Sequence, residues 1–420
     1  MPECSYDMAL PNPLDAGTDA AYVNVVKSIQ DLIASHASSQ QALLNEVENL
    51  RVRNTQLRAQ NQALQQEKSN LLQQKRNSAT AAYAQGNSRR DGERQASQVQ
   101  GTFEFVRNYT LNDQPVHSIA MHHDLNMFAT ASWDGKVKLV KVGEDGDNIR
   151  TLGENDPMGG LYTVAFSKPI GSNDRQTTAV LGCASCDKTV YLWDYEKGVM
   201  KQKLNAHMDE VNCIDFHETQ FVMASASDDK KCIIWDYHEG LELRKLDKHE
   251  KAVYGARFLG TEHQYMVATC SFDRYSRIFD MRNKKVTQSF QHHTDDVIGI
   301  DYASSKQLLA TGSDDGMIMG YDVRANKQRF RINTRQGDMV DNEVKRIAFS
   351  ANGDMLAAGI SSNAVLVYDL RPSQPTLCAT LGGHADCVFD VTWGVNPRNG
   401  ANLVVSASHD HTSRLWREIK

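Results

Sequence analysis

The chain has 420 residues, of which 40% are hydrophobic and 23% charged, and its formal net charge is −6 at pH 7. This composition is ordinary for a soluble protein with more than one structural unit. The acidic balance gives no general attraction to nucleic acid or to anionic membranes. No apolar run approaches the ~18 residues of a membrane-inserted helix, and the N-terminus resembles no secretory signal. The eight cysteines form no short disulfide framework, so we expect reduced thiols in a cytoplasmic or nuclear protein.

Residues 1–20 are rich in turn formers and predict a disordered N-terminus. Residues 21–76 predict one long helix, because neither glycine nor proline occurs between Gly17 and Gly86 and strand-and-turn structure needs such residues far more often. At ~1.5 Å per residue the regular part of this helix would span ~75 Å.

Within this helix, core positions repeat with the period of a coiled coil. Its predicted core is Leu43, Val47, Leu50, Asn54, Leu57, Asn61, Leu64 and Leu71. A buried Asn pairs with its mate in an in-register, parallel, two-stranded coil, so Asn54 and Asn61 predict a parallel dimer. Repulsion between Arg53 and Arg58 leaves a heterodimer open, and a lone helix docked on the protein's own core is a further alternative. A zipper-type DNA binder is disfavoured because no basic helix lies upstream.

Residues 77–100 are rich in Ser, Ala, Asn and Gln and predict a flexible linker. From residue 101 the chain repeats itself. Seven segments, from SWDGKVKLVKV to SHDHTSRLWRE, align on a turn position at intervals of 42 to 53 residues, which is occupied by Asp134, Asp187, Asp229, Asp273, Asp315, Ser362 and Asp410. Four of these aspartates follow a histidine by 22 to 26 residues, namely His207, His249, His293 and His384.

These residues resemble the WD-repeat family, in which each repeat builds a four-stranded blade. The resemblance implies that residues 101–420 form an all-β, seven-bladed propeller behind the helical coiled coil. It also implies hydrogen-bonded tetrads, complete in blade three and in blade seven: His207, Ser225, Asp229 and Trp235, and His384, Ser406, Asp410 and Trp416. Because the last blade is short of its outer strand, residues 102–111 are predicted to pair with it and close the ring.

The many His, Ser and Asp residues do not predict an enzyme. Their spacing assigns most of them to the tetrads, and the chain has no nucleophile elbow or phosphate-cradling loop. Cys183 and Cys186 form an isolated pair, whereas a zinc site would need a second pair of ligands. We therefore predict no catalytic residue, no metal site and no cofactor.

Binding is predicted instead on the face that carries the loops near the tetrad aspartates, where WD-repeat propellers commonly hold partners. The residues expected to bind there are His117, Trp133, Tyr162, Tyr254, Phe272, Lys345, Phe389 and His409. Large rigid aromatic side chains of this kind form the hot spots of protein interfaces. The alternative is that some of them only fill gaps between blades.

The sequence thus predicts a non-catalytic scaffold that dimerises through residues 22–71 and binds partner proteins within a multiprotein complex. Its plan is similar to that of the autophagy conjugation scaffolds and of the Groucho-type transcriptional corepressors. The stretch ATGSDDGMIMGYDVRANKQRF looks similar to blades of G-protein β subunits, which pair with a small helical partner. A component of an axonemal, splicing or other large assembly is compatible with the same pattern.

Overall fold

The computed structural model describes residues 27, 53, 103–122, 127–141, 148–154, 158–170, 180–335, 342–395 and 400–419. The chain divides into two compact units, Met1–Ala96 and Ser97–Lys420. In the first unit only Lys27 and Arg53 are described, and both are helical and exposed. The predicted N-terminal disorder, coiled coil and linker therefore lie outside the described residues. In the described part of the chain, no helix has the length and apolar character needed to span a membrane.

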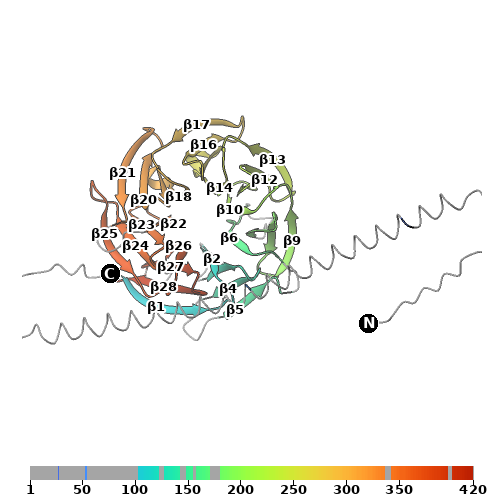
Figure 1. Ribbon diagram of the computed structural model, residues 1–420, viewed down its shortest axis with the longest axis horizontal. Helices are drawn as coiled ribbons and strands as arrows, with labels where there is room; N and C mark the ends of the chain where they lie inside the picture. The colour runs from blue at the N-terminus through green and yellow to red at the C-terminus, as the bar shows by residue number, and fades with distance from the viewer. Residues whose placement is uncertain are drawn as a thin grey trace, which may run out of the picture. The chain divides into compact units, whose positions relative to one another are not determined.

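The second unit is a ring of seven four-stranded antiparallel sheets, and this confirms the predicted seven-bladed propeller (Figure 1). Blades one to three are formed by β2 (Val116–Met121), β3 (Met127–Ser132), β4 (Val137–Lys141) and β5 (Asn148–Leu152); by β6 (Leu161–Phe166), β7 (Leu181–Ser185), β8 (Val190–Asp194) and β9 (Val199–Leu204); and by β10 (Val211–Phe216), β11 (Val222–Ser227), β12 (Cys232–Asp236) and β13 (Leu241–Leu246).

Blades four to six are formed by β14 (Val253–Phe258), β15 (Met266–Ser271), β16 (Ser276–Asp280) and β17 (Lys285–Phe290); by β18 (Val297–Ala303), β19 (Leu308–Ser313), β20 (Met317–Asp322) and β21 (Lys327–Asn333); and by β22 (Val344–Phe349), β23 (Met355–Ile360), β24 (Ala364–Asp369) and β25 (Thr376–Leu381). Short 3-10 helices, η1 (Thr261–His263) and η2 (Ser304–Lys306), connect the first two strands of blades four and five.

The seventh blade joins the beginning and the end of the propeller. It contains β26 (Val388–Val395), β27 (Asn402–Ser408) and β28 (Thr412–Glu418), with β1 (Phe103–Thr110) as its outer strand. β1 runs antiparallel to β28, from Phe103 opposite Glu418 to Thr110 opposite Thr412. The predicted closure is confirmed, and the pairing leaves β28 without a free edge.

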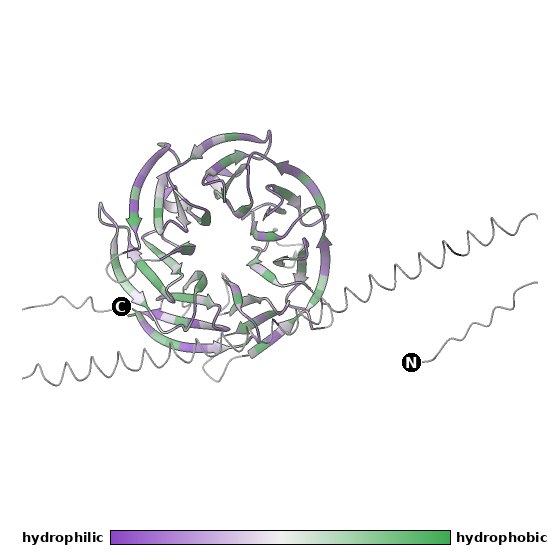
Figure 2. Cartoon of the chain, viewed as in Figure 1, coloured by the Kyte–Doolittle hydropathy of each residue, from purple (hydrophilic) through white to green (hydrophobic). Residues whose placement is uncertain are grey.

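The core lies between neighbouring blades. The middle strands β3, β19 and β23 are buried along their whole length. Each sheet is covered on one face by the preceding blade and on the other by the following blade, so both of its faces are apolar. One cluster, for example, packs Leu308 and Ile318 of blade five against Ile347 and Leu356 of blade six. The outer strands are largely exposed, and Figure 2 shows hydrophilic stretches along them.

The antiparallel order gives the ring two distinct faces. The connection from the first to the second strand of a blade lies on the same side as the turn from its third to its fourth strand, and η1 and η2 mark this side. The turn from the second to the third strand and the connection between blades lie on the other side. That side carries the turn aspartates, such as Asp229 and Asp410, and is called the tetrad face below.

Candidate protein-binding face

Blade three holds the predicted tetrad. Nδ1 of His207 lies 2.8 Å from Oδ2 of Asp229, and Nε2 lies 2.6 Å from Oγ of Ser225. The indole N–H of Trp235 donates to the same serine hydroxyl over 2.8 Å. Burial alone would raise the pKa of Asp229, but hydrogen bonds from His207 and from backbone N–H groups outweigh burial and lower it. The tetrad thus links the loop before the blade to the turn between the second and third strands of the blade.

Blades four and five make the same histidine bonds without a tryptophan. His249 lies 2.9 Å from Asp273 and 2.7 Å from the Thr269 hydroxyl. His293 lies 3.0 Å from Oδ2 of Asp315, and its other ring nitrogen lies 2.8 Å from the Thr311 hydroxyl. In blade four Arg277 also donates to Asp273 over 2.6 Å, and in blade five the Tyr321 hydroxyl forms a hydrogen bond with Thr311. A further side chain therefore takes part in each of these links.

Blade seven corrects one part of the prediction. His384 lies 2.9 Å from Asp410 and 2.7 Å from the Ser406 hydroxyl. Trp416, however, makes no hydrogen bond to Ser406 among the described residues. Its indole packs edge-on against His384, with ring centroids 6.0 Å apart, and against Phe105 of the closing strand at 6.5 Å. The tryptophan of this blade therefore contributes packing, while the other three residues form the polar link.

Blades one and two lack the full tetrad, and the sequence analysis missed the part that Asn112 plays in blade one. In blade one, the Thr130 hydroxyl donates to the side-chain oxygen of Asn112 over 3.3 Å, and these residues are 18 apart. The same separation joins His207 to Ser225, so the spacing was an available signal. In blade two the hydroxyl is replaced by a cysteine, and the buried indole nitrogen of Trp193 has no hydrogen-bond partner.

A β-bulge occurs at the second residue of the first strand in all seven blades. A bulged residue leaves the ladder and its side chain is re-aimed. The bulged residues lie at the tetrad-face end of their strands, and they are His117, Tyr162, Asn212, Tyr254, Ile298, Lys345 and Phe389. Five of these seven belong to the residues predicted to bind partners on this face, and the bulge gives a structural reason for their placement there.

A second set of seven residues lies beside the bulges. Each of them directly precedes a turn position and donates its backbone N–H to the carbonyl of the residue before the first strand, as Phe272 does to Ala252. The set is Trp133, Cys186, Asp228, Phe272, Asp314, Ser361 and His409. Each blade therefore places two side chains on the tetrad face, that of the bulged residue and that of the residue before the turn. Their chemical character depends on the sequence of the blade.

Four rings surround His117. Its ring centroid lies 5.4 Å from those of Trp133 and Tyr162, 4.4 Å from that of Phe389 and 4.7 Å from that of His409. His117 is buried, whereas Trp133 is 42% exposed. These five residues, called the aromatic group below, join blades seven, one and two into a rigid apolar surface with an accessible tryptophan.

The two histidines of the aromatic group behave as neutral rings. Their Nε2 atoms lie 3.2 Å apart, so one ring donates and the other accepts. Burial, the neighbouring His409 and the positive charge of Arg346 lower the pKa of His117 to about 3. Burial also lowers the pKa of His409. At neutral pH the group therefore carries no charge of its own.

The remaining predicted residues lie elsewhere on the tetrad face. Tyr254 and Phe272 stack in blade four with centroids 5.0 Å apart and an interplanar angle of 17°. Lys345 forms ion pairs with Asp314 at 3.0 Å and with Glu343 at 2.5 Å. The predicted aromatic residues thus gather in two groups, separated by polar residues of the intervening blades, rather than in an unbroken ring.

A buried charge network under this face was missed by the sequence analysis. Arg346 of blade six reaches Asp390 of blade seven, with Nε and Oδ1 3.6 Å apart, and Thr163 of blade two over 3.4 Å. The Ser118 hydroxyl of blade one donates to Asp390 over 2.7 Å. All four occupy the third position of a first strand, so the aligned repeats contained the signal. The network ties the inner strands of four blades together.

In the described part of the chain, no cluster of three or more His, Cys, Asp or Glu residues could hold a metal ion. Cys183 is buried in β7, and burial raises the pKa of its thiol. Cys186 is one of the residues that precede the turn aspartates, and burial raises its pKa too. Neither thiol therefore has the lowered pKa of a reactive or metal-binding cysteine.

Two family models match this chain. One is the WD domain, G-beta repeat, over residues 103–141 and 198–236, and the other is the N-terminal domain of nucleolar protein 10-like proteins, over residues 285–419. The chain therefore carries WD40 repeats, folded into a seven-bladed propeller. Such a WD-repeat propeller is suited to protein interaction or scaffolding.

Curated proteins similar to this chain are also WD-repeat proteins. A WD repeat-containing protein 91 homolog of Dictyostelium discoideum is 22% identical over 37% of this chain and 20% of its own. A guanine nucleotide-binding protein subunit beta of Oryza sativa subsp. indica is 32% identical over 27% and 30%. Protein transport protein sec13 of Aspergillus clavatus is 26% identical over 37% and 54%. The chain spans about half or less of the length of these relatives.

Proposed function

We propose that this protein is a non-catalytic scaffold that dimerises through residues 22–71 and holds partner proteins on the tetrad face. The aromatic group around His117 carries the proposal. Trp133 is 42% exposed, yet its ring is supported by His117 and Tyr162 at 5.4 Å each. A large side chain that is already fixed loses little entropy on binding, which is the property of an interface hot spot.

The polar residues beside the aromatic group complement it. The Tyr162 hydroxyl donates to Glu210 over 2.5 Å, and the Asn212 amide donates to Asp228 over 2.6 Å. Both carboxylates keep lone pairs for hydrogen-bond donors of a partner. An apolar centre with polar groups at its rim is the usual anatomy of a protein interface.

A dimer would present two such faces on one molecule. When one propeller has bound, the second meets its site at a raised effective concentration, so weak contacts on each face would sum to a tighter complex. The seven described cysteines are free, in keeping with action in the cytoplasm or nucleus.

Affinity purification tests the face. Compared with the wild-type chain, a variant carrying Trp133→Ala and another carrying Tyr254→Ala with Phe389→Ala should lose most captured partners. Leu241→Ala is the matched control, because Leu241 is 59% exposed on the outer strand β13. If every partner stays bound to both face variants, the tetrad face is not the site.

Sedimentation tests the dimer. The full chain and a peptide of residues 20–76 should both sediment as dimers, whereas residues 97–420 alone should be monomeric. A peptide that stays monomeric at tens of micromolar would contradict the coiled coil, and a defined monomer of the full chain would contradict the scaffold.

A second candidate is a G-protein β-like subunit that pairs with a small helical partner. The observation that favours it is the 32% identity to a G-protein β subunit over 116 residues. Residues 22–71 would then copurify with a short helical protein in a one-to-one complex. A homodimer without such a partner favours the scaffold.

A further inference from the structure

The outer side of blades four and five carries exposed cations that form no ion pair with a described residue. We call these six residues the basic flank: Lys284, Lys285, Arg324, Lys327, Arg329 and Arg331. All six are exposed, and none forms an ion pair with another described residue. Alternation along β21 explains part of the pattern, because Phe330 and Ile332 point inward while Arg329 and Arg331 face solvent.

The basic flank is continuous across two blades. The Gln288 side chain in β17 of blade four donates to the carbonyl of Val323 in blade five over 2.7 Å. Val323 directly precedes Arg324 in the turn that leads into β21. The bond therefore fixes the outer strand of one blade beside the cationic turn of the next.

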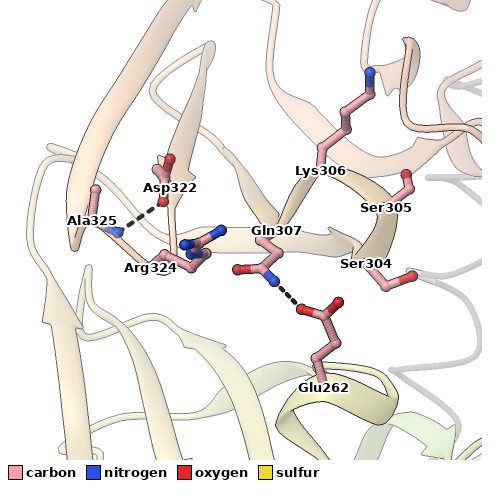
Figure 3. Close-up of a pocket in the computed structure, with 8 residues that line it drawn as sticks. All are labelled: Glu262, Ser304, Ser305, Lys306, Gln307, Asp322, Arg324 and Ala325. Atoms are coloured by element: carbon pink, nitrogen blue, oxygen red, sulfur yellow. Dashed lines mark hydrogen bonds between the residues drawn. The ribbon is translucent and has the colours of Figure 1, made fainter.

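Two hollows adjoin the flank, away from the tetrad face. Figure 3 shows the first, which is lined by Glu262, η2, Gln307 and the turn that carries Arg324. Its two carboxylates keep their charge while Glu262 accepts a hydrogen bond from Gln307 and Asp322 accepts one from the Ala325 N–H over 2.8 Å, and the six cations of the flank outnumber them. Arg324 makes no such contact with a described residue.

The second hollow lies between blades five and six. Its cations are Lys306, Arg329 and Arg371. Lys306 is paired with Asp354 at 2.9 Å and Arg371 with Asp369 at 2.6 Å, while Arg329 is free of ion pairs. Each hollow is thus lined by one unpaired arginine of the basic flank.

Protection of sheet edges explains these cations only in part. Charged residues on an outer strand discourage pairing with another chain, and charges of either sign achieve this. The outer strand β25 of blade six has no charged residue at all, whereas β21 of blade five has three cations and no acid. The concentration of one sign on two neighbouring blades therefore indicates a ligand of the opposite sign.

We propose that the basic flank binds the sugar–phosphate backbone of a nucleic acid. A polyanion supplies enough charges for six cations, and the planar fork of arginine matches phosphate oxygens in pairs. Val286, 37% exposed, is the one large exposed apolar residue in β17 and β21, which is too little for insertion into a bilayer. These strands expose no aromatic ring on which bases could stack, so binding is independent of sequence.

The net charge of −6 does not oppose this binding. Charges further apart than the Debye length of ~8 Å are largely screened at physiological ionic strength. Acidic residues such as Asp228, Asp295 and Asp314 lie on the tetrad face, on turns and connections away from the flank. Local charge therefore governs the outer side of blades four and five.

The test is titration of full-length protein into a labelled single-stranded oligouridylate between about 50 and about 200 mM salt. The wild-type chain should bind with an affinity that falls steeply with salt. Arg329→Glu with Arg331→Glu should weaken binding at least ~tenfold and flatten the slope of log K against log salt by about 1.4, or about 0.7 for each lost contact. Arg329→Gln with Arg331→Gln should flatten it equally, with a smaller loss of affinity.

Lys248→Glu with Lys251→Glu is the matched control, because these exposed lysines lie in a connection on the tetrad face and their reversal changes net charge equally. Binding should survive in this variant. The proposal is overturned if the wild-type chain does not bind at low salt, if both reversals weaken binding equally, or if poly-glutamate or phosphatidylserine vesicles compete better than the oligonucleotide. Partner capture by the tetrad face should persist in the flank variants, so the two proposals fail separately.

Discussion

At the scale of single residues, the seven tetrad-face turns share one backbone conformation. The residue after each turn position has a positive φ, between 66° and 75°, and these residues are Gly135, Lys188, Lys230, Arg274, Gly316, Asn363 and His411. The turn is held locally, since the Asp229 carboxylate accepts the N–H of Lys231 over 3.0 Å. Only two of the seven are glycines, so the others hold a conformation that side chains disfavour.

Replacing one of these residues by glycine should therefore stabilise the protein. Lys230→Gly removes a left-handed strain of ~1–2 kcal/mol and adds backbone entropy of ~0.4–1 kcal/mol to the unfolded chain. We expect a net gain of about 0.5–1 kcal/mol, measured by chemical denaturation of the full chain. Gly135→Ala is the opposite change and should destabilise, because its Cβ would lie 2.3 Å from the Met158 carbonyl oxygen. A loss of stability in Lys230→Gly would contradict the argument.

The sequence predicted the tetrads better than the surface that they support. A His and an Asp recur at nearly fixed separations, and the resemblance to the WD-repeat family implied that they pair. The central place of His117 could not, because it depends on rings from blades seven, one and two that meet only after the ring has closed. Contacts within a repeat can be inferred from one blade, whereas contacts between repeats require the curvature of the whole ring.

At the scale of strands, closure depends on β1. Phe103 of this strand is buried in the core between blades six and seven, with its ring centroid 6.0 Å from that of Trp393. Phe105, two residues on, is 54% exposed. A register shift lies between Phe105 and Arg107, so the first three residues of β1 and the last four pair with β28 in two registers that differ by one residue. The strand therefore carries two phenylalanines, one buried and one exposed, whose contributions to stability can be compared.

Phe103→Ala should cost about 3 kcal/mol or more, because truncating a buried phenylalanine leaves a cavity. Phe105→Ala is the matched control, and we expect a cost below about 1.5 kcal/mol, since the ring is half exposed but still contacts Trp416. Denaturant unfolding of both variants measures the difference. Equal costs would mean that β1 does not hold the ring closed through its buried end.

Strand number and strand order could be predicted, but the bulges could not. Recurring turn positions indicated seven repeats, which the resemblance to the WD-repeat family made seven blades, and the missing outer strand of the last blade pointed to residues 102–111. A bulge depends on how one strand pairs with the next, as between Val253 and Gly255 opposite β15, and no residue type marks it in this sequence. The charge network through Arg346 was also missed, although its four residues share one position in the aligned repeats, because the repeats do not show which blades face each other across the ring.

At the scale of the whole molecule, the repeated blades keep surfaces of different charge and polarity apart. The tetrad face combines an uncharged aromatic group with carboxylates such as Glu210 and Asp228, while the outer side of blades four and five is basic. Each blade offers the same backbone positions to solvent, so charge can accumulate on one side without disturbing the core. This explains how a chain of net charge −6 can present a cationic surface.

Two groups of buried carboxylates make stability depend on pH in opposite ways. In the tetrads, burial would raise the pKa values, but hydrogen bonds from histidine and from backbone N–H groups outweigh it. The pKa of Asp315 is lowered to about 2, and those of Asp229, Asp273 and Asp410 are also lowered. Burial instead raises the pKa of Asp215 to about 6, although the neighbouring Arg257 opposes this.

The buried histidines act together with the tetrad carboxylates, because the pKa of His117 is lowered to about 3, against ~6.5 for an unfolded His. The stability that His117 contributes is present above pH ~6.5 and is lost as the pH falls, and this loss exceeds the gain from Asp215. An unfolded Asp titrates near ~3.9, so the Asp215 contribution is fully present below pH ~4 and is lost as pH rises through 6. The tetrad contribution is present above pH ~4 and is lost as pH falls from ~4 towards ~2. Urea midpoints of the full chain should fall as the pH is lowered from 7, because the loss from His117 exceeds the gain from Asp215, and should fall most steeply below pH ~4. Asp215→Asn should make the fall between pH 7 and pH ~4 steeper, and Asp229→Asn should lower the midpoint at pH 7 and flatten the fall below pH ~4. Midpoints that stay level from pH ~4 to ~2 would show that the tetrad aspartates do not hold the folded state through their ionised form.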